Sequence, residues 1–174
     1  MMNAHPELNV LDDTAVDWEA AYRDLMPRVY NFFRYRVRDR QQAEDLTATT
    51  FLRAWRARDQ YSHDLSAFST WVFSIARHVA IDYYRQHHTD CSIDHQHHLA
   101  DTALEDALER RAVAARLAAL LAHLTPLEQE LIALKYGAEL TNRAIAPITG
   151  LSESNVGTML YRIIRKLRKE WDKP

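Results

Sequence analysis

The chain has 174 residues, of which 47% are hydrophobic, and it contains only 3 Gly and 5 Pro. This composition supports a globular protein with a hydrophobic core, favours helices over a turn-rich β fold, and fits one ordinary domain or two small ones. No apolar run approaches the roughly 18 residues that span a bilayer, and a single cysteine, Cys91, excludes an intrachain disulfide.

The net charge of −2 is an average over segregated charges. Residues 1–20 contain five acidic side chains and no Lys or Arg, and residues 89–109 contain six acidic side chains, again without Lys or Arg. An acidic start is unlike a secretory signal, which has a basic first segment, so we expect a cytoplasmic protein. Basic side chains gather instead in residues 34–40, 53–58 and 162–169. Such blocks are compatible with nucleic-acid binding despite the mean charge.

Helical periodicity of apolar residues begins near Val16. Pro27 marks a break or a new first turn, so we expect one helix before it and another over residues 28–37. Further helices are expected at residues 41–57, 68–86 and 104–124. A polar loop should separate the first two of these.

Residues 87–102 have no periodicity, and we interpret them as an extended acidic linker. Zinc ligands are abundant in and beside this segment: His87, His88, Cys91, His95, His97 and His98. Adjacent side chains of an extended chain point in opposite directions, and nothing nearby provides a rigid supporting shell. We therefore favour a plain linker and predict no metal site and no cofactor. Whether the histidines sense metal or pH stays open, since His titrates near neutral pH.

The last fifty residues contain a series of helix caps. Thr125 precedes Pro126 and Glu128 in the pattern of a capping box, with Gly137 expected just past the end of that helix. Thr141 can cap a short helix ending near Ile148.

Gly150 then provides a tight turn, and Ser152 can cap a long helix that runs to about Trp171. A short helix, a turn and a long basic helix are typical of a helix-turn-helix. Its small core should consist of Ala144, Ile145, Leu151, Val156 and Leu160.

The long helix has an apolar and a polar side. Small polar groups near a helix start can reach base edges in the major groove, while cations further along neutralise phosphates. A packing helix with a solvated basic face is the alternative, but the caps and turn upstream favour DNA contact. The outward side chains are Ser154, Asn155, Thr158, Tyr161, Arg162 and Arg165.

Four stretches, in order, resemble the extracytoplasmic-function subclass of bacterial RNA polymerase sigma factors over about residues 17–170. They are AEDLTATTFLRAW (43–55), FSTWVFSIARHVAIDYYRQ (68–86), LTPLEQELIALKY (124–136) and LSESNVGTMLYRIIRKLRK (151–169). The resemblance implies, in turn, a helix that grips core RNA polymerase, a helix that melts and reads the −10 element, the opening of a second DNA-binding domain, and its −35 recognition helix.

The resemblance also implies roles for particular residues. Those matching polymerase-binding positions are Asp45, Leu46, Phe51, Leu52 and Trp55. Those matching −10 DNA-binding positions, including the loop that holds a flipped base, are Asp59, Gln60, Tyr61, Trp71, Arg77, Asp82, Tyr83 and Arg85. Those expected at −35 DNA are Ser152, Ser154, Asn155, Thr158, Tyr161, Arg162, Arg165 and Lys166.

Four residues depart from the family pattern. Thr49 stands where Glu is usual and Ser74 where Arg is common. Gly157 and Met159 fall where the recognition helix often has Lys or Arg. A Gly inside a helix costs about 1 kcal/mol relative to Ala. Two missing cations should flatten the salt dependence of DNA binding by up to about two units. We therefore expect weak or unusual −35 binding.

The sequence thus predicts an all-α protein of two small helical domains joined by a flexible acidic linker, the second containing a helix-turn-helix. The expected division is an N-terminal tail (1–15), a polymerase- and −10-binding domain (16–86), a linker (87–103) and a −35-binding domain (104–174). Such a protein is not an enzyme, is not inserted in a membrane, and has core RNA polymerase and promoter DNA as partners. Members of this family are often held inactive by an anti-sigma factor, a further candidate partner.

Two other functions are compatible with parts of the sequence. One is a helix-turn-helix repressor or activator with an N-terminal helical sensor domain, which should form dimers on a palindromic operator. The other is a metal-dependent helical hydrolase that uses the histidine cluster. No phosphate-binding loop and no HExxH motif supports further catalytic chemistry.

Overall fold

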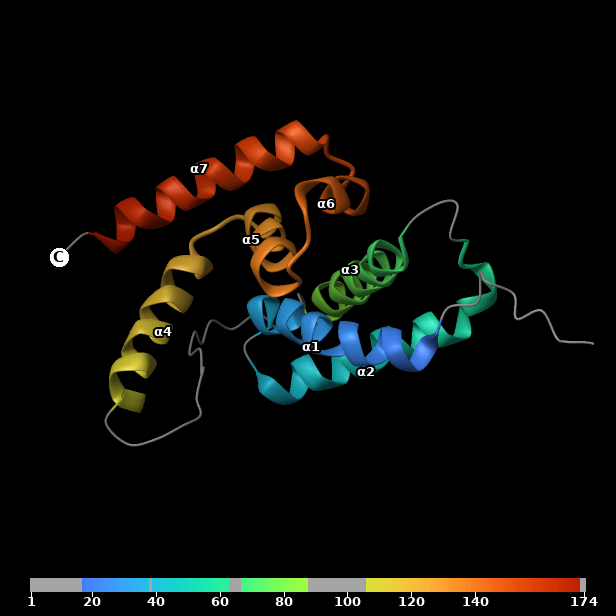
Figure 1. Cartoon of the computed structure of the whole chain (residues 1–174). Coiled ribbons are helices and arrows are strands. Elements are labelled where there is room, and N and C mark those ends of the chain that lie inside the picture. Colours follow the sequence, from blue (N-terminus) through green and yellow to red (C-terminus); the bar gives the residue numbers. More distant parts are fainter. Residues whose placement is uncertain (1–16, 38, 63–66, 88–105, 173–174) are drawn as a thin grey trace, which may run out of the picture.

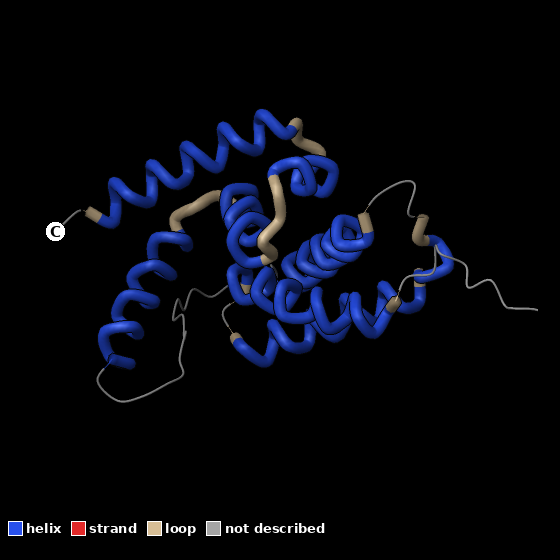
Figure 2. The backbone as a smooth tube through the Cα atoms, viewed as in Figure 1, coloured by secondary structure: helices blue, strands red, loops and turns tan. Residues whose placement is uncertain are grey.

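The computed structural model describes residues 17–37, 39–62, 67–87 and 106–172, with α4 side chains described from residue 112 onward. These residues form helices joined by short connections, and no strand occurs among them (Figures 1 and 2). The α-helices are α1 (Trp18–Arg36), α2 (Arg40–Arg56), α3 (Phe68–His87), α4 (Asp106–Ala122), α5 (Pro126–Ile132), α6 (Asn142–Thr149) and α7 (Glu153–Trp171). The expected linker, with all of its candidate ligands except His87, lies outside the described residues.

One continuous helix, α1, occupies the segment where a break was expected. Asp17 caps it by accepting a hydrogen bond from the backbone N–H of Ala20, and Pro27 lies inside it. The prediction of two helices separated at Pro27 is therefore wrong. Buried residues lie on both sides of the proline: Leu25, Val29, Phe32 and Phe33. Because they share one face of a single helix, their packing outweighs the hydrogen bond that Pro27 cannot make.

Helices α2 and α3 pack against α1 and against each other, and they agree with the predicted segments. Asp39 caps α2 by accepting a hydrogen bond from the backbone N–H of Gln42. Two buried threonines in α2, Thr47 and Thr50, donate their hydroxyl protons to the carbonyl oxygens four residues earlier. These bonds allow polar side chains to lie in an apolar contact without an unsatisfied donor.

The capping box predicted at Thr125 and Glu128 is present: each side chain accepts a hydrogen bond from the other residue's backbone N–H. The helix that it starts continues into one wide π turn, η3 (Ala133–Gly137). Gly137 is thus the last residue of the turn and not the residue after the helix. A Cβ at Gly137 would lie 3.0 Å from the backbone oxygen of Asn31 on α1, so a larger residue here would push α1 and η3 apart by a few tenths of an ångström.

The helix-turn-helix agrees closely with its sequence pattern. Thr141 caps α6, Gly150 has a left-handed φ of 76°, and Ser152 caps α7 through the N–H of Asn155. Ile145 and Val156 are fully buried between the two helices, and Leu160 is buried beside them. The expected core of the motif is confirmed, with Ala144 and Leu151 packed partly buried against it.

The N-terminal helices α1–α3 and the C-terminal helices α5–α7 share one hydrophobic core. Turn η3 packs along α1, and α6 packs against α3 (Figure 1). The cluster of buried side chains runs without interruption from Leu25 on α1 to Ile163 on α7. We call these two sets the N-terminal half and the C-terminal half.

Candidate polymerase and nucleic-acid interfaces

The predicted polymerase-binding residues lie on α2, and three of them are exposed. Leu52 is 49% exposed, Trp55 is 50% exposed, and Asp45 is also exposed. Large apolar side chains half open to solvent are typical of a protein contact surface. The other two predicted residues, Leu46 and Phe51, are partly buried and anchor α2 to the core.

An aromatic cluster lies beside Trp55. The rings of Tyr61, Phe68 and Trp71 are 5.1 to 5.6 Å apart at their centroids. Trp18, at the start of α1, packs edge-on against Phe68 at 5.2 Å and against Trp55 at 5.3 Å. Edge-on pairs at these distances add to the stabilisation from burial. The cluster therefore links the predicted polymerase-binding face to the segment predicted to bind −10 DNA.

Sequence reasoning assigned no functional role to Trp18 or Phe68. The family resemblance predicted −10 DNA-binding roles for two of their neighbours, Tyr61 and Trp71. The structure places both in the cluster, partly exposed, and burial raises the pKa of Tyr61. Trp18 lies far from the others in the sequence, so no local spacing could have identified it.

The −10 candidates differ in their surroundings. Asp59 and Gln60 are exposed in the short helix η1 (Arg58–Gln60), next to residues 63–66, which are not described. On α3, Arg85 is exposed, whereas Tyr83 is partly buried and donates its hydroxyl proton to Gln42 of α2. Burial, followed by the nearby Tyr84 and Asp39, raises the pKa of Tyr83.

Two other −10 candidates on α3 already have charged partners. Asp82 accepts a hydrogen bond from Arg53 of α2 at 2.8 Å, and this bond is the main reason why its pKa lies below the ordinary value. Arg77 donates its Nε proton to the buried carboxylate of Glu130, in the C-terminal half, at 3.0 Å. The predicted −10 residues on α3 therefore differ in direction: Arg85 is open to solvent, Asp82 and Tyr83 bond to α2, and Arg77 bonds to the C-terminal half.

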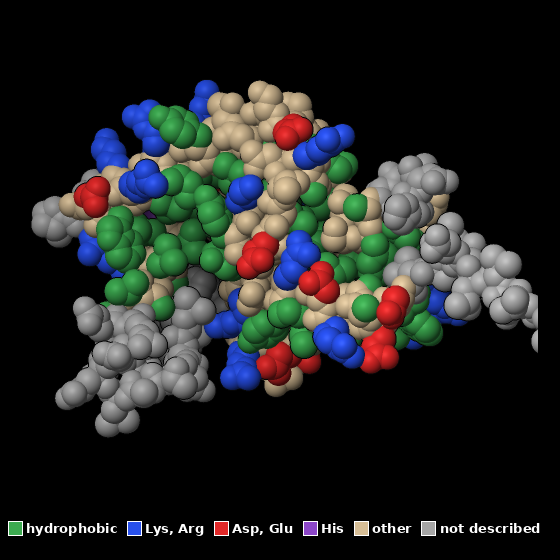
Figure 3. All heavy atoms as spheres, in the orientation of Figure 1, with side chains coloured by type: hydrophobic (Ala, Val, Ile, Leu, Met, Phe, Trp, Pro, Cys, Tyr) green, Lys and Arg blue, Asp and Glu red, His purple; other side chains and the backbone are tan. Residues whose placement is uncertain are grey.

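The predicted −35 residues form one open surface on α7. All eight are exposed, from the cap Ser152 to Lys166, while Val156, Leu160 and Ile163 point into the core. Lys and Arg side chains project along α7 in the space-filling view (Figure 3). The guanidinium of Arg165 lies 5.7 Å from the ring centroid of Tyr161. A helix whose polar start and basic body are both open has the form of a recognition helix.

Comparisons with known proteins match both halves to one family. The family model for sigma-70 region 2 matches residues 21–89, and the model for sigma-70 region 4 matches residues 114–167. The chain is 30% identical over 149 residues to the ECF RNA polymerase sigma factor SigM of Bacillus subtilis, covering 84% of this chain and 90% of that protein. The chain belongs to the ECF RNA polymerase sigma factors.

A second relative is the ECF sigma factor BldN of Streptomyces coelicolor, which is 28% identical over 152 residues. That alignment covers 85% of this chain but only 58% of BldN. The RNA polymerase sigma factor YlaC of Bacillus subtilis is 29% identical, with 89% of this chain and 92% of that protein covered. As an ECF sigma factor, this protein binds core RNA polymerase and promoter DNA and directs promoter recognition, DNA melting and initiation. The repressor or activator alternative is not favoured.

Two solved structures share the fold. The sigma factor RpoE of Bartonella quintana, in complex with the anti-sigma factor NepR, superposes with a TM-score of 0.72 at 18% identity, covering 90% of this chain and 99% of that chain. CnrH, in complex with the cytosolic domain of CnrY, gives a TM-score of 0.62 at 23% identity, covering 88% of this chain and 84% of that chain. These comparisons support the helical architecture alone.

Two of the sigma factor's departures from the family pattern lie on the inner side of α7. A Cβ at Gly157 would lie 3.3 Å from the side-chain nitrogen of Asn142, at the start of α6. Met159 is partly buried against the core. Gly157 therefore lies close to α6, and Met159 lies against the core.

No metal centre is found among the described residues, where no three His, Cys, Asp or Glu side chains are grouped to hold an ion. Of the candidate ligands near the linker, only His87 is described. It is exposed at the end of α3, where its ring stacks on Tyr83 at 4.1 Å. In the described part of the chain, no helix is both long and apolar enough to cross a bilayer.

Proposed function

We propose that this sigma factor has three functional surfaces, each with a different binding partner. The α2 face around Leu52 and Trp55 binds core polymerase, the segment from η1 to α3 opens and holds the −10 element, and α7 reads the −35 element. The strongest single observation concerns α7. All eight candidate residues there are exposed, and the cap at Thr141, the turn at Gly150 and the cap at Ser152 that precede them are all formed. We further propose that residues 16–86 and 104–174 are the two functional domains.

At the polymerase surface, the ring of Trp55 is held in place by contacts within the protein. Trp55 rests against Trp18, and the guanidinium of Arg58 lies 4.5 Å from its ring centroid. A held aromatic ring binds a partner at a smaller entropic cost than a mobile one. Asp45, seven residues before Leu52 and so on the same side of α2, adds a charge that can orient the complex.

At the −10 surface, the aromatic cluster is suited to strand separation. Extruding a base costs a few kcal/mol, which a protein can offset by stacking the base on aromatic side chains. Tyr61, Phe68 and Trp71 lie together at the end of the loop predicted to capture that base. Exposed Arg85 would contact the phosphates further along α3.

The test is run-off transcription with purified core polymerase and a promoter library, with and without this protein. We expect specific transcripts only when both proteins are present. The variant Trp55→Ala should weaken association with core at least tenfold, since a central aromatic anchor contributes about 2 kcal/mol or more, while circular dichroism stays unchanged. Tight promoter binding by the free protein, without any association with core, would contradict the assignment.

We also propose that the protein acts by binding alone, without catalysis or a cofactor, and in the cytoplasm, where its polymerase partner works. The solved neighbour RpoE is in complex with the anti-sigma factor NepR, and CnrH is in complex with the cytosolic domain of CnrY. An anti-sigma factor is a candidate regulator here. Because Gly157 and Met159 supply no cation, we expect weak −35 binding and a promoter preference dominated by the −10 element.

A further inference from the structure

Charged side chains cross the seam between the two halves. Arg28 on α1 donates its Nε proton to the carbonyl oxygen of Ala138 at 2.9 Å. Glu130 on α5 accepts from Arg77 on α3 at 3.0 Å, and Nη1 of Arg36 lies 3.7 Å from the same carboxylate oxygen. One carboxylate of the C-terminal half therefore holds two cations of the N-terminal half.

Glu130 is buried, with its side chain only 6% exposed, and Arg36 is similarly buried at 7%. A buried charge is tolerated only when it is paired, and removal of one partner strongly destabilises the arrangement that buries the other. The pairing of Arg36 is itself incomplete, since its Nε and Nη1 make no hydrogen bond within the described structure. In the closed form these donors are buried without a hydrogen-bond partner, which costs free energy. Separation of the halves would let water bind them and remove that cost.

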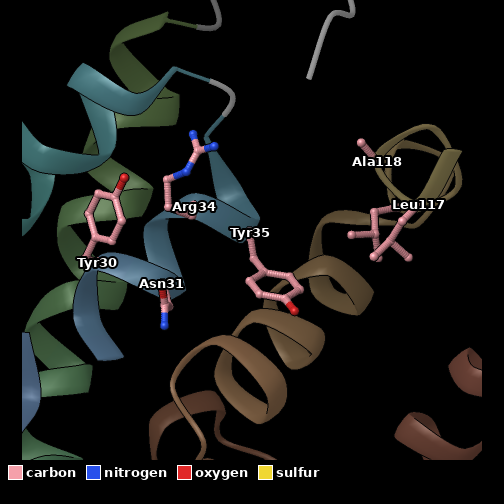
Figure 4. A pocket seen from close by; sticks show the side chains of 7 residues that line it. Tyr30, Asn31, Arg34, Tyr35, Leu117 and Ala118 are labelled. Carbon is pink, nitrogen blue, oxygen red and sulfur yellow. The ribbon is translucent and has the colours of Figure 1, made fainter. Parts of the chain in front are cut away.

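The packing along the seam is uneven. At one point the backbones touch, where Gly137 leaves no room for a Cβ beside Asn31. Beside the seam, where α1 meets α4 instead of the C-terminal half, lies a pocket of about 220 Å³, lined on one side by Tyr30, Arg34 and Tyr35 and on the other by Leu117 (Figure 4). A domain interior is packed without such hollows, whereas interfaces between domains are more polar and separate more easily.

Arg77 gives this contact a consequence for function. The family resemblance places Arg77 among the residues for −10 DNA, where a phosphate would be its partner. A carboxylate and a phosphate compete for the same guanidinium. We propose that Glu130 is a latch: by binding Arg36 and Arg77 it holds a closed form of the chain and withholds Arg77 from promoter phosphate. The second half of this statement rests on the function proposed for Arg77.

The first experiment measures closure without DNA. Glu130→Gln keeps the shape of the side chain but leaves two arginines without their counter-charge. In the free full-length chain we expect a larger radius of gyration by small-angle X-ray scattering. Amide exchange in α1 should be at least about tenfold faster where it faces η3. The matched control is Glu139→Gln, which removes an equal charge from an exposed position of the same half and should change neither quantity.

The second experiment measures the release of Arg77. Glu130→Gln should bind a fluorescent −10 strand several-fold more tightly than the original chain does, and Glu139→Gln should not. Adding Arg77→Gln to Glu130→Gln should abolish the gain. Gly137→Ala provides an independent way to loosen the seam, because its methyl group would lie 3.0 Å from a backbone oxygen of the other half and push the two apart by a few tenths of an ångström. It should speed amide exchange in α1 where it faces η3 while the Glu130 charge is still present.

Three results would overturn the latch. A Glu130→Gln chain as compact as the original would show that the ion pairs do not hold the halves. An open chain with unchanged DNA affinity would show that Arg77 is not withheld. A loss of helix content would make Glu130 a part of the folding core. Failure of the proposed function is distinct from all three, since it would appear as absence of core-dependent transcription by the original chain.

Discussion

Asp82 lies where α3 faces α2, and its two oxygens accept hydrogen bonds from different arginines. Arg53 of α2 donates to one oxygen at 2.8 Å, and Arg85 of α3 donates to the other at 3.2 Å. The hydrogen bond from Arg53 lowers the pKa of Asp82 most. The positive charges of Arg53, Arg85 and His78 lower it further against the opposing effect of desolvation. This residue therefore joins two helices, whatever its part in DNA binding.

A pH dependence follows from that lowered pKa. The folded pKa lies below the unfolded value near 3.8, so Asp82 stabilises the fold at pH values above 3.8. The contribution is lost as the pH falls through the folded pKa. Asp82→Asn should therefore lower the free energy of unfolding at pH 7, and the difference from the original protein should vanish in strong acid. Urea titrations between pH 7 and about pH 2 measure it.

Glu19→Gln is the control for that titration series. Its partner Arg23 lies four residues away on the same helix, and both side chains are more than three-quarters exposed. Surface pairs of this kind contribute little. If Asp82→Asn and Glu19→Gln lower the free energy of unfolding by the same amount, Asp82 has no special role between α2 and α3.

Local sequence could not reveal that several candidate side chains have internal partners. Asp82, Tyr83 and Arg77 were assigned to DNA on the basis of resemblance, but each has a hydrogen-bond partner 29 to 53 residues away in the chain. Such partners depend on how helices pack. By contrast, the exposure of Asn155 and Arg162 followed from the 3.6-residue period alone.

At the scale of the helix, α7 separates two kinds of contact. Asn155 lies in the first turn, where a side-chain amide can read a base edge, and Arg162 lies two turns further along, where it can reach a phosphate. Arg162→Ala should weaken binding to all −35 sequences and lower the salt slope by about one unit. Asn155→Ala should change base preference while the salt slope stays the same.

Titration of holoenzyme with promoter variants at several salt concentrations separates these effects. Lys169→Ala is a suitable reference, because Lys169 is exposed on α7 but lies beyond the predicted contact residues. The interpretation of α7 fails if Asn155→Ala reduces the affinity for every promoter by the same factor. It also fails if Lys169→Ala matches the effect of Arg162→Ala.

Helix ends could be predicted from sequence where a cap or a turn residue defines them. The caps at Thr125, Thr141 and Ser152 all form as expected, because each needs only residues three positions away. The break predicted at Pro27 was wrong, since the cost of one missing hydrogen bond was smaller than the gain from packing α1 on the core. The wide turn of η3 was also not foreseen.

For the whole molecule, the shared core predicts cooperative unfolding. Leu25 on α1 and Ile163 on α7 belong to one buried cluster, so calorimetry of the original chain should show a single transition that includes both halves. Glu130→Gln should separate it into two, because it weakens the contact through which the halves stabilise each other. Two well-separated transitions in the original chain would contradict a cooperative core.

The sequence by itself determined the helical class, the caps, the helix-turn-helix and the family, because these depend on periodicity and on motifs a few residues long. Only the tertiary structure decided that α1 is unbroken, that Trp18 joins the aromatic cluster, and that Glu130 binds Arg36 and Arg77. These features arise from residues distant in the chain. The physical reason is burial, because a charge or an aromatic ring that is removed from water is stabilised by whichever partner the packing of the helices brings next to it, and no local pattern specifies that partner.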